Sequence, residues 1–377
     1  MSTASLAETA ALLPGRFQEW FATRGWLPRE HQLALLSKAR HDRSALLIAP
    51  TGAGKTLAGF LPTLVELCGS PSLPSSREPA ADLPHTQGGE RRNFVSTGRG
   101  VSRSGGLHTL YISPLKALAV DIARNLEAPI AEMRLPVKVE TRTGDTPVSR
   151  RQRQRRYPPD ILLTTPEQLA LLLASDDAPY LFSALRRVVL DELHALVTSK
   201  RGDLLSLGLA RLWRIAPDMH AIGLSATVAE PEQLAQFLVP QRQGKSEAAE
   251  IVIAGGAAPP IVEMLDTREL LPWAGHGARH ALSEVYGLIK RNTTTLVFVN
   301  TRSQAEMLFQ ELWRVNDDGL AIALHHGSLD VAQRRKVEQA MTAGKLRAVV
   351  CTSSLDLGVD WGDVDLVINV GAPKGAS

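Results

Sequence analysis

The segment Ala49–Thr56, APTGAGKT, constrains the fold of this chain more than any other. An apolar run, Ala45–Ile48, precedes it and an apolar, helix-forming run follows, which is the order of a strand, a phosphate-binding loop and a helix. A flexible surface turn would leave both flanking runs unexplained, although Ala49 replaces the first glycine of the usual motif. We therefore predict a site for a nucleoside triphosphate, taken to be ATP, with Mg²⁺.

The residues of this loop have distinct chemical roles. Small residues let backbone N–H groups surround the phosphate oxygens. Lys55 supplies a positive charge to the outer phosphates, and the Thr56 hydroxyl can bind Mg²⁺. The nucleotide-binding residues that we predict here are Thr51, Gly52, Ala53, Gly54, Lys55 and Thr56.

Two adjacent carboxylates follow another apolar run, Val188–Leu190. The carboxyl ends of parallel strands open into the ligand crevice of an α/β sheet. We predict that Asp191 binds Mg²⁺ and that Glu192 orients and deprotonates the attacking water. An Asp-Glu pair after a strand is also common as a helix cap, but the phosphate loop upstream favours catalysis. The predicted catalytic residues are Lys55, Asp191, Glu192 and His194, and the predicted Mg²⁺ ligands are Thr56 and Asp191.

Short β-type runs alternate with helix-like stretches over most of the chain, which is typical of parallel α/β sheets. At 377 residues, the chain is long enough for two domains. We predict a first domain at 1–240, with an insertion at 69–106 whose Gly, Pro and Ser content favours disorder. A polar linker at 241–274 and a second α/β domain at 275–377 follow. The expected strands are Thr109–Ser113, Ile161–Thr164, Val188–Leu190, Ile222–Leu224, Thr295–Val299, Leu320–Leu324, Ala348–Cys351 and Leu366–Asn369.

Composition argues against several classes of protein. Cys68 and Cys351 lie far apart without metal-ligand spacing, which argues against a disulfide framework and a structural zinc site. The chain does not open with a basic region and a long apolar stretch, and it has no run of about 18 apolar residues. We therefore expect a cytoplasmic protein with no membrane partner. The net charge of +3 supports a polyanionic partner only if basic residues cluster.

Three motifs together carry a family resemblance. Ser225 and Thr227 follow a further apolar run, and their hydroxyls could hydrogen-bond His194 or the acidic pair. In the order APTGAGKT, DELH and SAT, the chain resembles superfamily 2 helicases. The resemblance implies two RecA-like parallel-sheet domains of a P-loop NTPase. It also implies that Ser225 and Thr227 couple ATP hydrolysis to movement on nucleic acid.

Longer phrases narrow the resemblance. YISPLKALAVDIARNL, ETRTGDTP, PPDILLTTPEQLALLL and LDELHALVTSKRGDLL are similar to the large helicase-related family of DEXH-box proteins. Among its members, the bacterial ligase-associated branch is the most similar. That resemblance implies ATP-driven 3′-to-5′ movement on single-stranded DNA, in DNA repair.

The resemblance assigns further residues to the nucleotide and the nucleic acid. Gln32 lies where the family reads adenine, although a lone glutamine on a helix is more often solvated. The segment 351–360 resembles motif V, which implies that Gly358 and Asp360 approach the nucleotide from the second domain. The implied nucleic-acid-binding residues are Pro114, Lys116, Arg142, Thr143, Gly144, Thr165, Pro166, Thr301, Arg302, His326, Gly327 and Thr352.

Two groups of residues, one basic and one aromatic, could contact nucleic acid, and each has an alternative interpretation. Arginine concentrates at 142–156, where Asp145 is the only acid in the range 141–156. This run could neutralise backbone phosphates, with salt-sensitive binding, or form a solvated helix face, and we favour neither. Trp313 and Trp361 could stack on bases, but packing in a core or interface is favoured.

The sequence ends at Ser377, where the resemblance next requires the arginine-rich motif VI. We therefore expect an N-terminal fragment whose second domain is incomplete. The leading hypothesis is the ATPase core of a DNA helicase, with DNA repair proteins as partners by resemblance only. One alternative binds ATP and nucleic acid without turnover, and another is an RNA helicase. A phosphate-loop kinase is a third, but it leaves the second α/β domain without a role.

Overall fold

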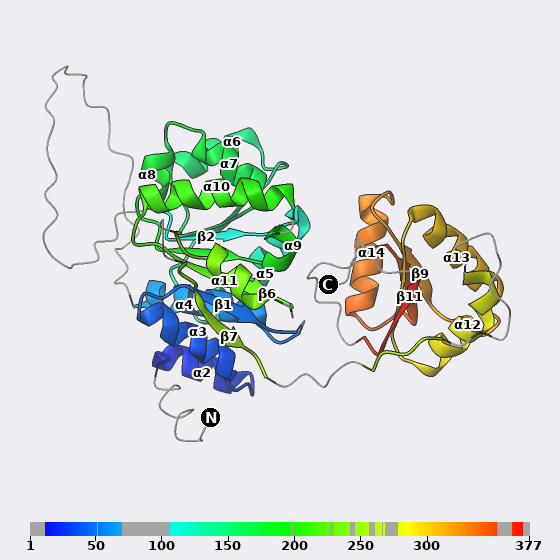
Figure 1. Cartoon of the computed structure of the whole chain (residues 1–377). Coiled ribbons are helices and arrows are strands. Elements are labelled where there is room, and N and C mark those ends of the chain that lie inside the picture. Colours follow the sequence, from blue (N-terminus) through cyan, green and yellow to red (C-terminus); the bar gives the residue numbers. More distant parts are fainter. Residues whose placement is uncertain are drawn as a thin grey trace, which may run out of the picture.

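The computed structural model describes residues 12–50, 52–69, 106–197, 199–226, 228, 230–241, 246–255, 261–265, 267, 278–352 and 364–371. Thr51, Thr227, Gly358, Asp360, Trp361 and nearly all of the predicted insertion lie outside these residues. The described chain forms two α/β domains, each with a parallel sheet (Figure 1). The predicted fold class is confirmed.

The first sheet has seven parallel strands in the order β3-β4-β2-β5-β6-β1-β7. Strands β1, β2, β4 and β5 are buried along their whole length, because helices cover both faces of the sheet. The order places β6 between β1 and β5, so the loops that follow all three strands open at one edge. The strands are β1 (Ala45–Ile48), β2 (Thr109–Ile112), β3 (Val139–Arg142), β4 (Ile161–Thr164), β5 (Arg187–Leu190), β6 (His220–Ser225) and β7 (Glu250–Ile253).

Two apolar cores lie on opposite faces of this sheet. One packs Leu47 and Val189 against α2, α3, α4 and α5, and the other packs Leu46 and Val188 against α7 to α11. The helices of the first face are α2 (Gly15–Thr23), α3 (Glu30–Arg40), α4 (Lys55–Cys68) and α5 (Lys116–Glu132). Those of the second face are α7 (Pro166–Leu173), α8 (Ala178–Phe182), α9 (Leu193–Val197), α10 (Lys200–Ile215) and α11 (Pro231–Phe237), while α6 (Val148–Arg156) follows β3.

Strand β7 changes the predicted end of the first domain. It lies inside the predicted linker 241–274, yet it pairs in parallel with β1 from Ala45 opposite Glu250 to Ile48 opposite Ile253. The β-branched residues Ile251 to Ile253 favour a strand, and the polar residues around them concealed it. The first sheet therefore extends to Ile253.

The second domain repeats the plan on a smaller scale. Its described sheet has the order β11-β8-β10-β9, with α12 and α13 on one face and α14 on the other (Figure 1). The predicted strand at 320–324 begins instead at Ile322. The elements are η1 (Ala278–Ala281), α12 (Leu282–Arg291), β8 (Thr295–Val299), α13 (Arg302–Arg314), β9 (Ile322–His325), α14 (Val331–Thr342), β10 (Ala348–Cys351) and β11 (Leu366–Val370). Among the described helices, none is both long and apolar enough to cross a membrane.

Candidate ATPase and nucleic-acid site

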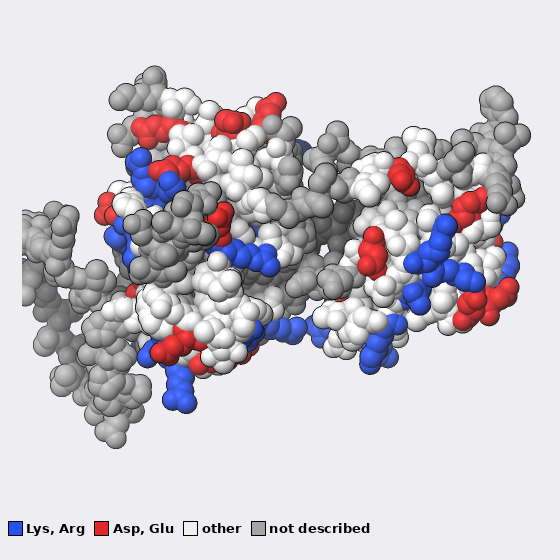
Figure 2. All heavy atoms as spheres, turned by 90° about the horizontal axis from the view of Figure 1, so that it is seen from below, with Lys and Arg blue, Asp and Glu red and all other residues white. Residues whose placement is uncertain are grey.

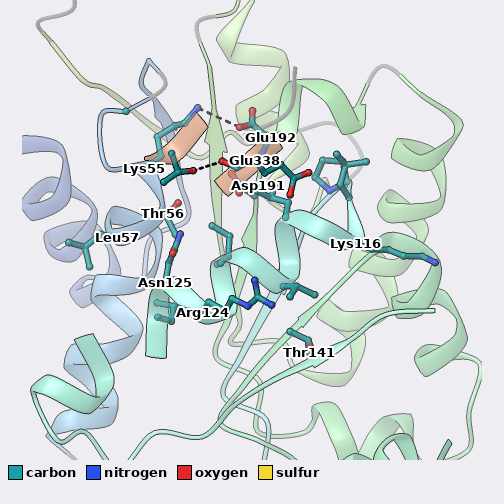
Figure 3. Close-up of a pocket in the computed structure, with 18 of the residues that line it drawn as sticks. Lys55, Thr56, Leu57, Lys116, Arg124, Asn125, Thr141, Asp191, Glu192 and Glu338 are labelled. Carbon is teal, nitrogen blue, oxygen red and sulfur yellow. Dashed lines mark hydrogen bonds and ion pairs between the residues drawn. The ribbon is translucent and has the colours of Figure 1, made fainter. Parts of the chain in front are cut away.

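A cavity of 2680 Å³ lies at the carboxyl ends of the strands of the first sheet and is also lined by the second domain. Figure 3 shows Lys55, Asp191 and Glu192 together at one part of it and Lys116 at another. The predicted catalytic residues and several predicted nucleic-acid contacts therefore share one space. The predicted site residues that line it are Gln32, Gly52, Gly54, Lys55, Thr56, Pro114, Lys116, Thr143, Thr165, Asp191, Glu192, Thr301, Arg302, Gly327 and Thr352.

The phosphate loop is held by the first turn of α3. Arg29 donates a hydrogen bond from Nη1 to the Gly52 carbonyl at 3.1 Å, and His31 Nε2 lies 2.9 Å from the Ala53 carbonyl oxygen. Burial lowers the pKa of His31, so the ring is neutral and donates from Nε2 at neutral pH. Gly52 and Gly54 have positive φ, a conformation that glycine adopts without strain. Sequence reasoning missed both Arg29 and His31, because their contacts depend on how α3 packs.

Gln32 is buried rather than solvated, so the usual alternative for a glutamine on a helix does not apply. Its Oε1 accepts a hydrogen bond from the Arg29 backbone N–H at 3.0 Å and thereby caps α3. A Cβ added at Gly54 would lie 3.2 Å from Gln32 Nε2. The side chain therefore lies against the phosphate loop, in a position compatible with the predicted nucleotide contact.

The acidic pair is buried at the end of β5. Lys55 Nζ lies 3.8 Å from Glu192 Oε1 across the space between the phosphate loop and this strand (Figure 3). Burial raises the pKa of the Asp191 carboxyl to about 6, and the Glu192 charge acts in the same direction. A φ of 45° at Glu192 places a non-glycine residue in the left-handed region, which is typical of functional turns. Two carboxylates thus lie beside a single lysine, and a bound divalent cation would balance the remaining negative charge.

The Asp191 carboxylate is fixed at both oxygens. The Glu192 backbone N–H donates to Oδ1 at 2.9 Å, and the Tyr111 hydroxyl donates to Oδ2. Among the described residues, no group of three or more His, Cys, Asp or Glu side chains suits a metal ion. Thr56 and Asp191 therefore fit Mg²⁺ only together with nucleotide phosphates, as is usual for this ion.

His194 joins the acidic pair to the end of β6. Its Nδ1 lies 3.1 Å from Ser225 Oγ and accepts weakly from the Ala226 backbone N–H at 3.4 Å, while its Nε2 lies 3.5 Å from Glu192 Oε2. Burial lowers the pKa of His194, and the Lys55 charge acts in the same direction. A neutral ring with its proton on Nε2 satisfies all three contacts. The predicted contact between the Ser225 hydroxyl and His194 is therefore present.

The candidate nucleic-acid residues of the first domain surround the start of α5. Lys116 is exposed and pairs with Asp145 at 3.2 Å, and a Cβ at Gly144 would lie 3.0 Å from its ammonium group. On the face shown in Figure 2, acidic and basic side chains are interspersed rather than separated by sign. Because Lys116 already pairs with Asp145, a phosphate that binds at Lys116 would replace Asp145 as its partner.

The arginine run combines an exposed helix face with contacts that support a loop. Arg142 is buried rather than exposed for the predicted nucleic-acid contact, and its Nη1 donates to the Arg151 carbonyl at 3.2 Å. Arg151 in turn donates to the carbonyls of Thr143 and Gly144 at 3.2 and 2.5 Å. Other arginines pair with carboxylates: Arg150 and Arg153 with Glu140, and Arg155 with Asp177. The run thus supports the loop at 143–145, while Arg150, Arg153 and Arg155 stay about half exposed on α6, as the solvated-face hypothesis expects.

Two residues of the second domain lie in settings that bear on their predicted roles. His326 is 1% exposed, with Nε2 3.2 Å from Glu306 Oε1, so it is not presented to a nucleic-acid backbone. Its neighbour in sequence, His325, lines the cavity and pairs with Glu338 at 3.2 Å. Trp313 is 60% exposed beside Phe309 on α13, so it does not pack in the described core, and packing at an interface and stacking on bases both stay predictions.

Comparisons with known proteins agree with this arrangement. The family model described as DEAD/DEAH box helicase matches residues 29–235, and the helicase conserved C-terminal domain matches 278–377. The ATP-dependent helicase Lhr-Core of Methanothermobacter thermautotrophicus is 34% identical, over 98% of this chain and 41% of that protein. The Lhr helicase/uracil glycosylase of Escherichia coli is also 34% identical, over 97% of this chain and 26% of that protein.

A solved structure supports the same relationship. The Mycobacterium smegmatis helicase Lhr bound to single-stranded DNA and AMP-PNP is 33% identical, with a TM-score of 0.72 over 97% of this chain and 45% of that one. The chain thus spans less than half the length of these relatives. The predicted resemblance to the large helicase-related family is confirmed, whereas the closer resemblance to the ligase-associated branch stays a prediction.

Proposed function

Because this chain belongs to the DEAD/DEAH box helicases, we propose that it forms the ATP-hydrolysing core of a DNA helicase that moves 3′ to 5′ on single-stranded DNA. The carrying observation is the approach of Lys55 to Glu192, beside buried Asp191, in a cavity that also reaches Lys116 and Arg302. A kinase acting on a small molecule would have no use for that second part of the cavity.

The residues around the acidic pair fit ATP and Mg²⁺. Thr56 and Asp191 would hold the ion, and Lys55 would bind the outer phosphates. Bound Mg²⁺ supplies charge neutralisation to the phosphate oxygens. Glu192 accepts the proton of the attacking water, a role generally worth roughly 10²–10⁴ in rate. Its carboxylate lies between Lys55 and His194, and these two contacts would fix the position from which it accepts the proton.

Further residues complete the proposed assignment. His194 and Ser225 would transmit the state of Glu192 to β6 and thus couple hydrolysis to nucleic-acid binding. We propose a reducing cytoplasm, because the two cysteines of the chain, Cys68 and Cys351, lie in different domains, which argues against a disulfide framework. We also propose a role in DNA repair, on the strength of the family resemblance. The proposed nucleotide residues are Gln32, Thr51, Gly52, Ala53, Gly54, Lys55, Thr56, Gly358 and Asp360.

The test is ATP hydrolysis by residues 1–377, with and without single-stranded DNA, and with nucleotide binding measured in parallel. Lys55→Ala and Glu192→Gln should each lower stimulated turnover by at least about 10²-fold. The matched controls are Lys345→Ala and Glu127→Gln, which change exposed residues. Equal turnover in Glu192→Gln and wild type would refute the catalytic assignment, and absence of nucleotide binding would refute the proposed function.

Substrate and polarity need a separate measurement. Duplexes with a 3′ or a 5′ single-stranded DNA tail, and matched RNA tails, should be unwound only from a 3′ DNA tail. Preference for a 5′ tail would refute the polarity, and preference for RNA would refute the substrate.

A further inference from the structure

We propose that Tyr111 is a positioning residue that holds the Asp191 carboxylate in the orientation required for Mg²⁺. This inference rests on the proposed function, because it takes Asp191 to be the Mg²⁺ ligand. Tyr111 itself is fully buried and does not line the cavity, whereas Asp191 does. It therefore acts through Asp191 rather than on the nucleotide.

The register of the sheet brings the two side chains together. Strand β2 pairs with β5 so that Tyr111 lies opposite Val189. Side chains two residues apart on a strand share a face, so Asp191 lies on the same face as Val189, about 7 Å further along. A tyrosine side chain spans about that length, and its hydroxyl donates to Asp191 Oδ2. A shorter side chain at position 111 would not reach.

The ring is fixed as firmly as the hydroxyl. Tyr111 stacks on Phe60 of α4, with ring centroids 5.2 Å apart and an interplanar angle of 26°. Helix α4 begins at Lys55, so the same helix carries the phosphate-loop lysine and the support of the tyrosine ring. Movement of α4 relative to β5 would therefore displace Lys55 directly and would disturb Asp191 through the ring of Tyr111.

Packing alone does not account for the hydroxyl. The neighbouring strands place apolar side chains in the same core, Leu163 and Val189 among them. Burying a hydroxyl without a partner costs free energy, so a phenylalanine would fill this position at less cost if packing were the only demand. The hydroxyl is instead used to complete the fixation of Asp191, whose Oδ1 already accepts from the Glu192 N–H.

The experiment measures how Mg²⁺ strengthens nucleotide binding, without any turnover. A fluorescent non-hydrolysable ATP analogue is titrated with the protein in EDTA and at increasing Mg²⁺. In Tyr111→Phe we expect metal-free affinity within about twofold of wild type, and a Mg²⁺ midpoint raised about tenfold or more, as for other residues that orient metal ligands. An unchanged midpoint would overturn the proposal.

Two control variants separate the hydroxyl from the ring and from general effects. Tyr286→Phe removes a tyrosine hydroxyl that donates to Asp318 and lies 3.0 Å from Asn316 Oδ1 in the second domain, and it should leave the midpoint unchanged. Phe60→Leu removes the stacking partner but keeps the hydroxyl, and it should raise the midpoint less than Tyr111→Phe. A larger rise in Phe60→Leu would overturn the proposal, because packing would then dominate.

Asp191→Asn distinguishes this inference from the proposed function. It should raise the midpoint at least as much as Tyr111→Phe. If Asp191→Asn leaves the midpoint unchanged, the proposed Mg²⁺ ligand is wrong. If Asp191→Asn raises it and Tyr111→Phe does not, only the role of Tyr111 is wrong.

Discussion

The two ends of the first sheet place charged groups between the same three elements, α4, β2 and β5, with opposite results. At the amino end, Arg187 donates two hydrogen bonds to Glu66, at 2.7 and 3.0 Å. At the carboxyl end, Asp191 and Glu192 share Lys55, which is 3.8 Å from the nearer carboxylate. Charge is balanced at the amino end and acidic at the carboxyl end.

The pKa values of Glu66 and Asp191 shift in opposite directions, as this difference in charge balance predicts. Burial opposes ionisation of Glu66, but hydrogen bonds from His108 and Arg187 lower its pKa to about 2. Burial raises the pKa of Asp191 to about 6. The amino end thus stabilises the fold, whereas the carboxyl end retains negative charge that a bound cation would neutralise.

The largest effect on stability is expected from breaking the balanced end. Arg187→Met removes one of the two partners of Glu66, and because Arg187 is buried whereas Glu66 is 38% exposed, the loss should be about 2–4 kcal/mol. Urea unfolding should show this loss. The control Arg186→Met changes a neighbouring, half-exposed arginine and should cost less than about 1 kcal/mol. Equal losses in the two variants would remove the distinction between the ends.

Neutralising the acidic end should have the opposite sign. The raised pKa of Asp191 means that stabilisation by its proton is complete below its ordinary pKa and is lost as pH rises through about 6. In EDTA at pH 8, Asp191→Asn should therefore be more stable than wild type, by up to about 3 kcal/mol. The gain should shrink at pH 5. Destabilisation at pH 8 would contradict the prediction, and the exposed Asp145→Asn is the control.

The pH dependence of the amino end should run the other way. Because the pKa of Glu66 is lowered, its stabilisation is present above its ordinary pKa and is lost as pH falls through about 2. Glu66→Gln should cost about 1–2 kcal/mol at pH 7, a value reduced for its partial exposure. Urea unfolding at pH 3 should show a smaller difference from wild type. A difference that grows toward low pH would exclude this account.

The smallest expected effect concerns the hydroxyl beside this pair. Thr63 Oγ1 accepts from Arg187 Nη1 at 3.3 Å and lies 3.0 Å from Thr109 Oγ1. Thr63→Val should cost about 1 kcal/mol in urea unfolding and leave the Mg²⁺ midpoint unchanged. The exposed Thr23→Val should change neither quantity. A shifted Mg²⁺ midpoint in Thr63→Val would show that the two ends are coupled.

Local patterns predicted much of the fold and the centre of the site. The order of strand, loop and helix around Lys55, and the carboxylates after β5, are fixed by neighbours in sequence. A short β-branched signal at Ile251 to Ile253 was available but was outweighed by its polar surroundings.

Other features depend on contacts that no local pattern contains. The link from Tyr111 to Asp191 requires the register of two strands. The pairing of the arginine run with Glu140 requires α6 to lie beside β3, which the sequence alone does not indicate. Burial of His326 likewise depends on α13, which carries Glu306.

Strand β1 also has a consequence for synthesis of the chain on the ribosome. Its partners are β6 and β7, so Ala45–Ile48 has no strand to pair with until the chain has grown beyond residue 220. Throughout that time, an apolar strand with two open edges is available to chaperones or to other nascent chains. The phosphate loop is thus synthesised early, but β1, which precedes it, pairs with β6 and β7 only late in the folding of the first domain.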